Sequence, residues 1–361
     1  MTGRVARPLS PFGLEAWVRW GATRGRHNVA CSGFPVQPLS SLGLDDKFWE
    51  AAWATSPDEH TRDLQQALAR TYGGKPDEFL ICLGASEADF AVALGALGPG
   101  DGAVVEQPAY FSLLEPARAL GARVKRADWG AARGGKPTAD AFLPHLDKTT
   151  RLVALARPNN PTGARIADEE ILRVAEAAEK VGAVVLVDEV FAEATPQGDR
   201  PAARLHPAIA TANSLTKCLG FGPLQVGWVQ AAPDVLEQSR LAKWHTRPLA
   251  PNLDMAVGVR VLAQRDRILA AMRARRARNV EQVRAFTEAS GVAWTGAGEG
   301  TTCMLRSPPD DHAFALRLLE DHGVLVSPGS LIEMPGWVRI GLLADPAVLA
   351  LALQGIQAAL A

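Results

Sequence analysis

The segment Ser214-Leu215-Thr216-Lys217-Cys218-Leu219-Gly220 follows a short apolar run from Ala208 to Ala212. The apolar run predicts a buried strand, with Lys217 just beyond its carboxyl end and a glycine-rich turn, 220–223, after it. Burial lowers the pKa of an amine, so a lysine here can act as a neutral nucleophile and form a Schiff base. An exposed loop lysine explains the isolated segment equally well, and the motifs before and after it decide between the two.

Upstream of this segment, short apolar runs alternate with helical patterns. Strands are predicted at Phe79–Leu83, Ala103–Glu106, Arg123–Lys125, Leu152–Ala156 and Ala183–Val187, and helices at 84–97, 113–120 and 168–181. This alternation is typical of an α/β fold with a mainly parallel sheet covered by helices, in which ligands bind at the carboxyl ends of the strands. Five polar or aromatic candidates fall at those ends: Gly84–Ser86, Tyr110, Asn160, Asp188 and Lys217.

Composition narrows the function classes. The 361 residues are 47% hydrophobic and 21% charged, with a net charge of −1, so no basic excess favours nucleic acid or a membrane surface. We find no apolar run long enough to span a bilayer, and residues 1–10 lack the apolar core of a signal peptide. The four cysteines form no Cys-x-x-Cys pair, which favours free thiols in the cytoplasm, and no metal site is expected.

The remainder of the chain predicts a second, smaller unit. Residues 234–288 have a helical pattern, and a helix is predicted at Arg62–Tyr72 with a loop at Asp58–Arg62 before it. Residues 292–361 predict an α+β unit with strands at Thr302–Arg306 and Val338–Gly341. Its helices are expected at Asp311–Asp321 and Pro346–Leu360.

In this order and spacing, the motifs resemble those of the fold-type I, class I/II aminotransferases, which depend on pyridoxal 5′-phosphate (PLP). The resemblance covers nearly the whole chain, and its most specific piece is Pro158-Asn159-Asn160-Pro161-Thr162-Gly163. The other pieces are Gly84-Ala85-Ser86-Glu87-Ala88, Pro108-Ala109-Tyr110, Asp188-Glu189-Val190-Phe191, Ser214-Leu215-Thr216-Lys217, Gly227-Trp228 and Val338-Arg339-Ile340-Gly341. The stretch 11–20, the Ser32-Gly33 loop and residues 322–329 are similar, more weakly, to the capreomycidine-synthase-like branch.

The resemblance implies a PLP-dependent transferase fold: a large domain with a mainly parallel seven-stranded sheet and a small α+β domain. The expected divisions are an N-terminal arm and part of the small domain at 1–45, the large PLP-binding domain at 46–245 and the small C-terminal domain at 246–361. A homodimer with the site at the subunit boundary is also implied.

The resemblance also implies a role for each candidate residue. Lys217 would form the Schiff base with PLP and shuttle the α-proton, and Asp188 would keep the pyridine nitrogen protonated. The other expected cofactor-binding residues are Gly84, Ala85, Ser86 and Ser214 at the phosphate, Tyr110 stacked on the ring, Asn160 at the ring hydroxyl, and Gln225. The expected substrate-binding residues are Arg339 for the α-carboxylate, Asn160 and the backbone of Gly33. The alternative interpretations are a helix-cap acid for Asp188, a turn asparagine for Asn160, a core tyrosine for Tyr110 and a surface arginine for Arg339.

Three positions depart from the family pattern. Phe191 stands where a tyrosine usually contacts the ring oxygen, and Gln225 where an arginine usually binds the phosphate. The tyrosine that many members lend across the dimer aligns near Thr55, in a stretch without tyrosine. These changes predict that the phosphate is held less tightly, unless another cation replaces the arginine, and they affect the predicted reaction more than the predicted cofactor.

The leading hypothesis is a PLP-dependent aminotransferase that moves an amino group from an amino acid to a 2-oxo acid. A PLP-dependent lyase, decarboxylase or cyclase on an amino acid is the alternative, because the same carbanion can partition several ways. A non-catalytic PLP or amino-acid sensor is a minor one. A nicotinamide-dependent dehydrogenase is disfavoured, because no Gly-x-Gly-x-x-Gly follows the first predicted strand.

Overall fold

A computed structural model describes residues 11–196, 200–248, 252–296 and 298–360. Its main element is a seven-stranded sheet in the order β2 (Phe79–Leu83), β8 (Val226–Gln230), β7 (Ile209–Ser214), β6 (Val184–Asp188), β5 (Thr150–Ala156), β3 (Gly102–Gln107) and β4 (Arg123–Asp128). The neighbours from β7 to β4 pair in parallel, and β8 is antiparallel to both β2 and β7. The predicted mainly parallel, seven-stranded α/β sheet is confirmed.

Alternate residues of the central strands supply two apolar layers, one on each face of the sheet. Val105, Ala154 and Leu186 pack in a cluster with α4 (Gly84–Ala96), α5 (Phe111–Ala119) and α7 (Pro233–Trp244). Val104 and Val153 pack on the other face with α6 (Asp168–Glu179). The helices thus fix the sheet from both sides, and its strand ends are free to carry polar groups.

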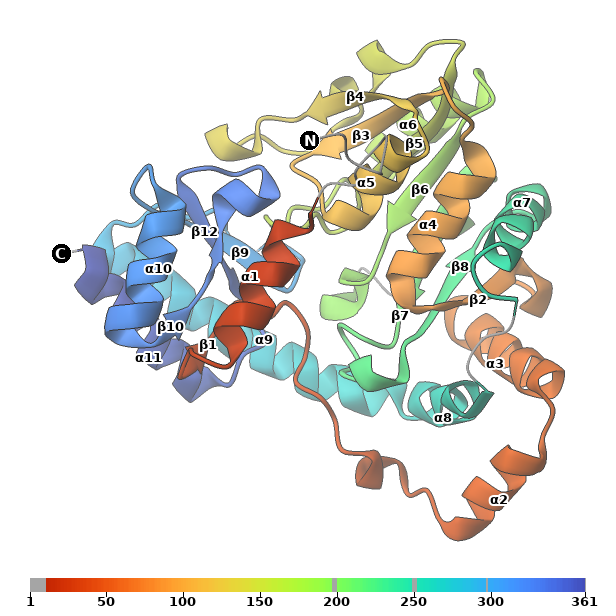
Figure 1. The fold of residues 1–361 in the computed structure, drawn as a ribbon, viewed down its shortest axis with the longest axis horizontal. Helices are drawn as coiled ribbons and strands as arrows, with labels where there is room; N and C mark the ends of the chain where they lie inside the picture. Colours follow the sequence, from red (N-terminus) through yellow and green to blue (C-terminus); the bar gives the residue numbers. More distant parts are fainter. Residues whose placement is uncertain (1–10, 197–199, 249–251, 297, 361) are drawn as a thin grey trace, which may run out of the picture.

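A third cluster joins the edge of the sheet to helices that are distant in sequence. Leu64 and Leu68 of α3 (Pro57–Tyr72) pack with Trp228 of β8 and with Met255 and Val261 of α8 (Asn252–Ala263). The long helix α9 (Arg265–Ser290) then runs from α8 to the second, smaller unit (Figure 1). The domain boundary expected after residue 245 stays a prediction.

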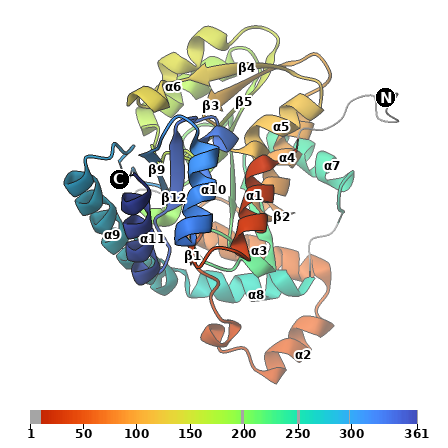
Figure 2. The same cartoon turned by 60° about the vertical axis from the view of Figure 1, so that its left-hand side comes forward.

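The smaller unit is built from both ends of the chain. Its antiparallel sheet has the order β11 (Ser327–Pro328), β12 (Trp337–Gly341), β9 (Thr302–Arg306), and β1 (His27–Asn28) pairs in parallel with β10 (Val324–Leu325). In Figures 1 and 2, α1 (Gly13–Ala22), α10 (Asp311–His322) and α11 (Pro346–Leu360) surround these strands. Trp17 of α1 packs in the same core as Phe314 and Leu353, so the N-terminal helix belongs to this unit.

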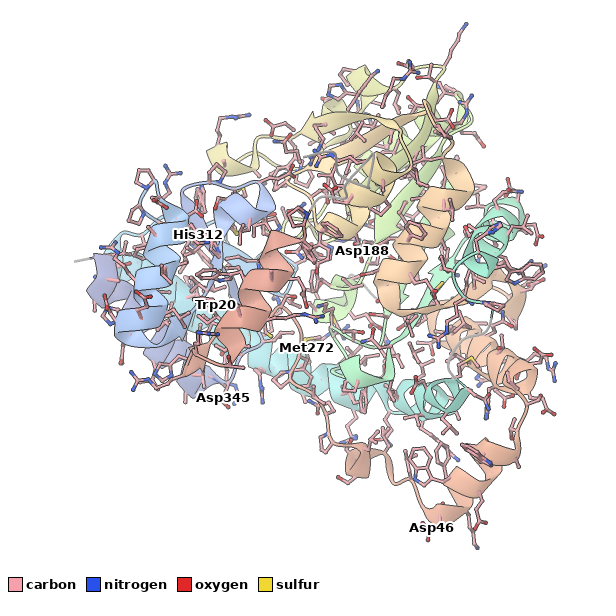
Figure 3. All side chains as sticks on the ribbon, viewed as in Figure 1. Trp20, Asp46, Asp188, Met272, His312 and Asp345 are labelled. Carbon is pink, nitrogen blue, oxygen red and sulfur yellow. The ribbon has the colours of Figure 1, made fainter. Side chains whose placement is uncertain are left out.

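The segment between the two units extends away from the body. In both views α2 (Asp46–Ala54) projects outward, and the label of Asp46 lies far from that of Asp188 in Figure 3. The next helix, α3, begins at Pro57 rather than Arg62, so the loop predicted at Asp58–Arg62 is wrong. Ser56 and Glu59 form a capping box, which satisfies the free N–H groups of the first turn and sets this earlier start.

The carboxyl ends of β6 and β7 lie near α1 of the smaller unit, since Asp188 and Ser214 line one cavity with Glu15 of α1. No helix in the described ranges combines the length and the apolar character needed to cross a bilayer.

Candidate active site

A cavity of about 340 Å³ lies at the carboxyl ends of the parallel strands. Asp188 lies between α1 and α4 in the view of Figure 3. The cavity brings together most of the predicted site residues, namely Gly84, Ala85, Ser86, Tyr110, Asn160, Asp188, Ser214, Lys217 and Gln225. Strands that are separated by more than a hundred residues therefore deliver their terminal side chains to one place, as expected for an α/β sheet.

Gly84 opens one end of the cavity as a cradle for an anion. It has a positive φ of 70°, which turns β2 sharply into α4, and no side chain caps the first N–H groups of that helix. A Cβ on Gly227 of β8 would lie 2.3 Å from the Gly84 carbonyl carbon, so only glycine allows this approach of the two backbones. The free N–H groups and the helix dipole make this end suited to a phosphate.

Asp188 ends β6 and is buried. Burial raises the pKa of its carboxyl to about 6, opposed by the hydrogen bond from the Val190 backbone N–H and by the charge of Lys217. A cationic ring nitrogen placed against this carboxyl would stabilise its charged form and lower the pKa. The position therefore suits a carboxylate that holds a proton on a pyridine nitrogen.

Lys217 lies in the turn after β7 and lines the same cavity. Burial, followed by the charge of Arg339, lowers the pKa of its amine below the ordinary value. At a given pH a larger fraction of this amine is therefore neutral and able to attack a carbonyl group.

Arg339 of β12, in the smaller unit, is not among the described residues that line the cavity, but it contacts the lining residue Asn160. Its Nη1 donates to Asn160 Oδ1 at 3.0 Å, and its Nη2 donates to the carbonyl oxygen of Ala30 at 2.9 Å and to Ser327 Oγ at 3.2 Å. Its buried Nε has no hydrogen-bond partner among the described residues, and burial lowers the pKa of the guanidinium. A buried donor left unpaired beside Asn160 fits a ligand carboxylate at this point.

Gly33 lies against the lysine segment. The Phe34 N–H donates to the Lys217 carbonyl oxygen at 2.7 Å, and a Cβ on Gly33 would lie 3.5 Å from Lys217 Cδ. The Ser32-Gly33 loop thus packs on the catalytic lysine predicted from the sequence.

The departures from the family pattern also take defined places. Phe191 is buried and lines the cavity. Gln225 lines it too, but has a positive φ of 52° and donates its Nε2 to the Gly222 carbonyl oxygen at 2.7 Å. Thr55 ends α2, outside the described residues that line the cavity. Among those lining residues, Lys217 and Arg19 carry the positive charges, and Arg19 is paired with Glu15 at 2.7 Å.

Sequence reasoning missed the wall that α1 supplies. Phe12, Glu15 and Arg19 line the cavity, and Phe12 packs edge-on against Tyr110 with ring centroids 5.4 Å apart. These residues share the side of α1 opposite Trp17, by their i, i+3, i+7 spacing, but a face of mixed apolar and charged residues does not by itself indicate a site.

A buried polar pair at the cavity wall was also missed, of which Ser112 lines the cavity and Asp89 does not. Ser112, at the start of α5, donates to Asp89 Oδ2 at 2.6 Å, and burial and then the charge of Asp188 raise the pKa of Asp89. Asp89 sits inside the apolar α4 pattern, which gave no reason to single it out.

The residues present fit PLP. They supply an anion cradle, an acid for a ring nitrogen, an amine for an aldehyde, and the Ser214 hydroxyl beside the cradle.

Comparison with known proteins agrees with this fit. The family "Aminotransferase class I and II" matches residues 51–356. The histidinol-phosphate aminotransferase of Methanopyrus kandleri is 32% identical over 154 residues, 43% of this chain and 39% of that protein, so the chain spans about two fifths of that relative's length. The capreomycidine synthase of Streptomyces vinaceus is 26% identical, covering 94% of this chain and 90% of the relative.

Solved structures show the same fold. A PLP-dependent aminotransferase from Streptococcus suis superposes with a TM-score of 0.90 at 25% identity, and the match covers 98% of both chains. The fold, the motif order and the family match agree with one another. The chain belongs to the class I and II aminotransferases, and its cofactor is pyridoxal phosphate.

Proposed function

We propose that the protein is an aminotransferase that moves an amino group from an amino acid to a 2-oxo acid, with Lys217 as the residue that holds PLP. The observation that carries the proposal is the shared cavity of Lys217, Asp188 and the Gly84–Ser86 cradle, with Arg339 joined to it through Asn160. When bound, PLP supplies an electron sink for negative charge at the substrate α-carbon.

The protein's own residues then divide the work. Lys217, with its lowered pKa, takes the proton from the α-carbon and returns it. Asp188 holds a proton on the ring nitrogen, and Tyr110 supplies a ring face on which the cofactor stacks. The Gly84–Ser86 backbone and Ser214 bind the phosphate, with Gln225 beside them.

The substrate end of the cavity is assigned to three residues. Arg339 binds the α-carboxylate, and its buried, unpaired Nε supplies the donor. Asn160, which accepts from Arg339, orients that guanidinium, and the Gly33 backbone closes the same side. The Phe12 ring, directly before α1, packs against Tyr110 and so excludes water there.

The test is to load the purified protein with PLP, add a panel of amino acids singly and follow the visible spectrum. Transamination predicts that the amino group passes to the cofactor and that a 2-oxo acid appears in equal amount. Borohydride reduction before the addition is expected to attach the cofactor to Lys217, as read by peptide mass spectrometry. Cofactor attached to a different side chain would refute the assignment.

A cyclase or lyase on an amino acid is the second candidate. The observation in its favour is the likeness to capreomycidine synthase over 94% of the chain, combined with Phe191 at the cavity wall. In that case the same panel changes the spectrum, but the cofactor returns to its starting form because no amino group is left on it: a cyclase keeps the amino group on the product, and an eliminating lyase releases it as ammonia.

We also propose a homodimer, in the cytoplasm, as the working form. The support is the outward segment around α2, where Trp53 is 79% exposed and Val36 is 66% exposed. Large apolar side chains grouped on one projecting segment are typical of a protein–protein contact. Sedimentation of wild type against Trp53→Ser tests it, and a wild-type monomer at all concentrations would refute it.

A further inference from the structure

A carboxylate of the smaller unit reaches across to the large sheet and lies next to a predicted site residue. Glu333, just after the short 3-10 helix 329–332, accepts two hydrogen bonds from Arg126 of β4, with Nη1–Oε1 at 2.5 Å and Nη2–Oε2 at 2.6 Å. Its Oε2 also accepts from the Ala109 backbone N–H at 2.9 Å. Ala109 directly precedes Tyr110, so this one carboxylate holds the backbone on which the Tyr110 ring depends.

The backbone around Glu333 is fixed in an uncommon conformation. Glu333 has a positive φ of 61°, which among the described non-glycine residues it shares with Gln225 alone. Its neighbours Ile332 and Met334 are buried in one apolar cluster with Trp129, which follows β4. A left-handed backbone at a residue other than glycine persists only where its surroundings determine it. Burial on both sides therefore directs the Glu333 side chain towards β4.

The same loop is tied firmly to its own unit. Asp311 is buried and accepts from Ser330 N at 3.0 Å, Ser330 Oγ at 2.6 Å and Gly336 N at 2.7 Å. The Met334 N–H closes the loop on the Gly329 carbonyl oxygen at 2.8 Å. β12 begins at Trp337, so Arg339 lies two residues into the strand that this braced loop starts.

Arg126 is anchored just as firmly on the large sheet. Its Nη2 also donates to the Glu106 carbonyl oxygen at 2.6 Å, and its Nε to that of Val105 at 3.4 Å. The side chains of Arg126 and Glu333 are 19% and 28% exposed. A forked, partly buried pair of this kind is stronger and more directional than an exposed one. The Lys125–Asp147 pair, one residue away on the same strand, is 43% and 46% exposed and stays within the large sheet's unit.

We propose that the Glu333–Arg126 pair is a positioning device that sets Tyr110 relative to Arg339, and so sets the cofactor ring relative to the substrate carboxylate. Neither residue is among the described residues that line the cavity, so both act through others. The proposal rests on the proposed function, since the roles of Tyr110 and Arg339 belong to it.

The test compares the PLP-loaded wild type with Glu333→Gln, which keeps an acceptor for Ala109 but loses the charge, and with Arg126→Lys, which loses the fork. Asp147→Asn is the matched control, because it breaks the exposed pair on the same strand. Visible circular dichroism of the bound cofactor, without any amino acid, reports the ring's asymmetric setting against Tyr110. The dissociation constant of 2-aminoisobutyrate, which has an α-carboxylate and no α-proton, reports the Arg339 side by its spectral change.

We expect Glu333→Gln to weaken 2-aminoisobutyrate binding about tenfold and to reduce the visible dichroism, with a smaller effect in Arg126→Lys and none in Asp147→Asn. Combining Glu333→Gln with Arg126→Lys should weaken binding no more than the worse single change. A lowered unfolding temperature with unchanged affinity and dichroism would overturn the proposal, because the pair would then only stabilise the fold. If wild type itself shows no response to 2-aminoisobutyrate or to the amino-acid panel, the proposed function fails instead, and the dichroism alone decides the positioning role.

Discussion

Glu106 offers a test of the electrostatics behind the cavity that does not depend on the reaction. It lies on β3, is 1% exposed, and accepts from the Ala156 N–H at 2.7 Å. Burial raises the pKa of its carboxyl from 4.5 to about 8, against the lowering effect of that hydrogen bond. The folded protein therefore keeps a proton on Glu106 at neutral pH, whereas the unfolded chain releases it.

The sign follows from proton linkage. Below pH 4.5 the Glu106 carboxyl is protonated in both the folded and the unfolded state, so its ionisation does not affect the free energy of unfolding. Between pH 4.5 and about 8 only the folded state holds it, so the free energy of unfolding falls by about 1.4 kcal/mol per pH unit and levels off above pH 8. The 3.5-unit shift gives a total of about 5 kcal/mol. Glu106→Gln keeps the acceptor and the shape but removes this dependence.

Unfolding temperatures measured from pH 5 to 8 check this prediction. For 361 residues, an unfolding entropy of about 2 cal/mol/K per residue converts 5 kcal/mol to roughly 7 °C. Glu106→Gln should therefore match wild type near pH 5 and exceed it by several degrees at pH 8. Glu176→Gln, an exposed change on α6, is the control for lost charge. A difference between Glu106→Gln and wild type that does not grow with pH would refute the reasoning.

Three further predictions follow from the site and its frame. Gln225→Arg should tighten PLP binding to the apoprotein about tenfold, because a charge-assisted hydrogen bond to the phosphate replaces a neutral one. The dissociation constant of PLP is measured by absorbance titration. An unchanged dissociation constant would count against a phosphate at the Gly84–Ser86 cradle. Phe191→Tyr should lower the pH midpoint at which the visible band of the PLP-loaded protein changes, because a phenol beside the ring oxygen favours the deprotonated imine. A midpoint that is unchanged or higher would contradict this prediction. Gly341→Ala should lower the free energy of unfolding by about 3 kcal/mol or more, because its Cβ would lie 1.8 Å from the Cys31 carbonyl oxygen. An unaltered urea midpoint would show that the backbone around Cys31 can move away from Gly341 at no cost.

The sequence predicted the large sheet well because its signals are local. Mostly apolar runs of five residues, at Leu152–Ala156, Ala183–Val187 and Ala208–Ala212, mark β5, β6 and β7. The rule that ligands bind at strand ends then grouped Tyr110, Asn160, Asp188 and Lys217, which line one cavity. The predicted strands do not include β8, because Val226–Gln230 lies only a few residues after the glycine-rich turn that follows Lys217. The start of α3 was misjudged although Ser56 and Glu59 carry a recognisable capping signal.

Other features had no local signal. Glu333 meets Arg126 across 207 residues, and neither residue belongs to a motif. The approach of Glu15 and Arg19 to the cavity depends on how α1 packs on β11, which hydrophobic spacing within α1 does not specify. Long-range pairs of this kind follow from the assembled fold rather than from the pattern of any one segment.

The pairing of β1 with β10 has a consequence for biosynthesis. β1 cannot pair with β10 until the ribosome has synthesised Val324, about 300 residues after His27. At ordinary elongation rates that interval lasts roughly 15 to 60 seconds, during which the α1 face that carries Trp17 lacks its permanent partners. Nascent chains should therefore offer chaperones an apolar amino-terminal helix until translation is almost complete.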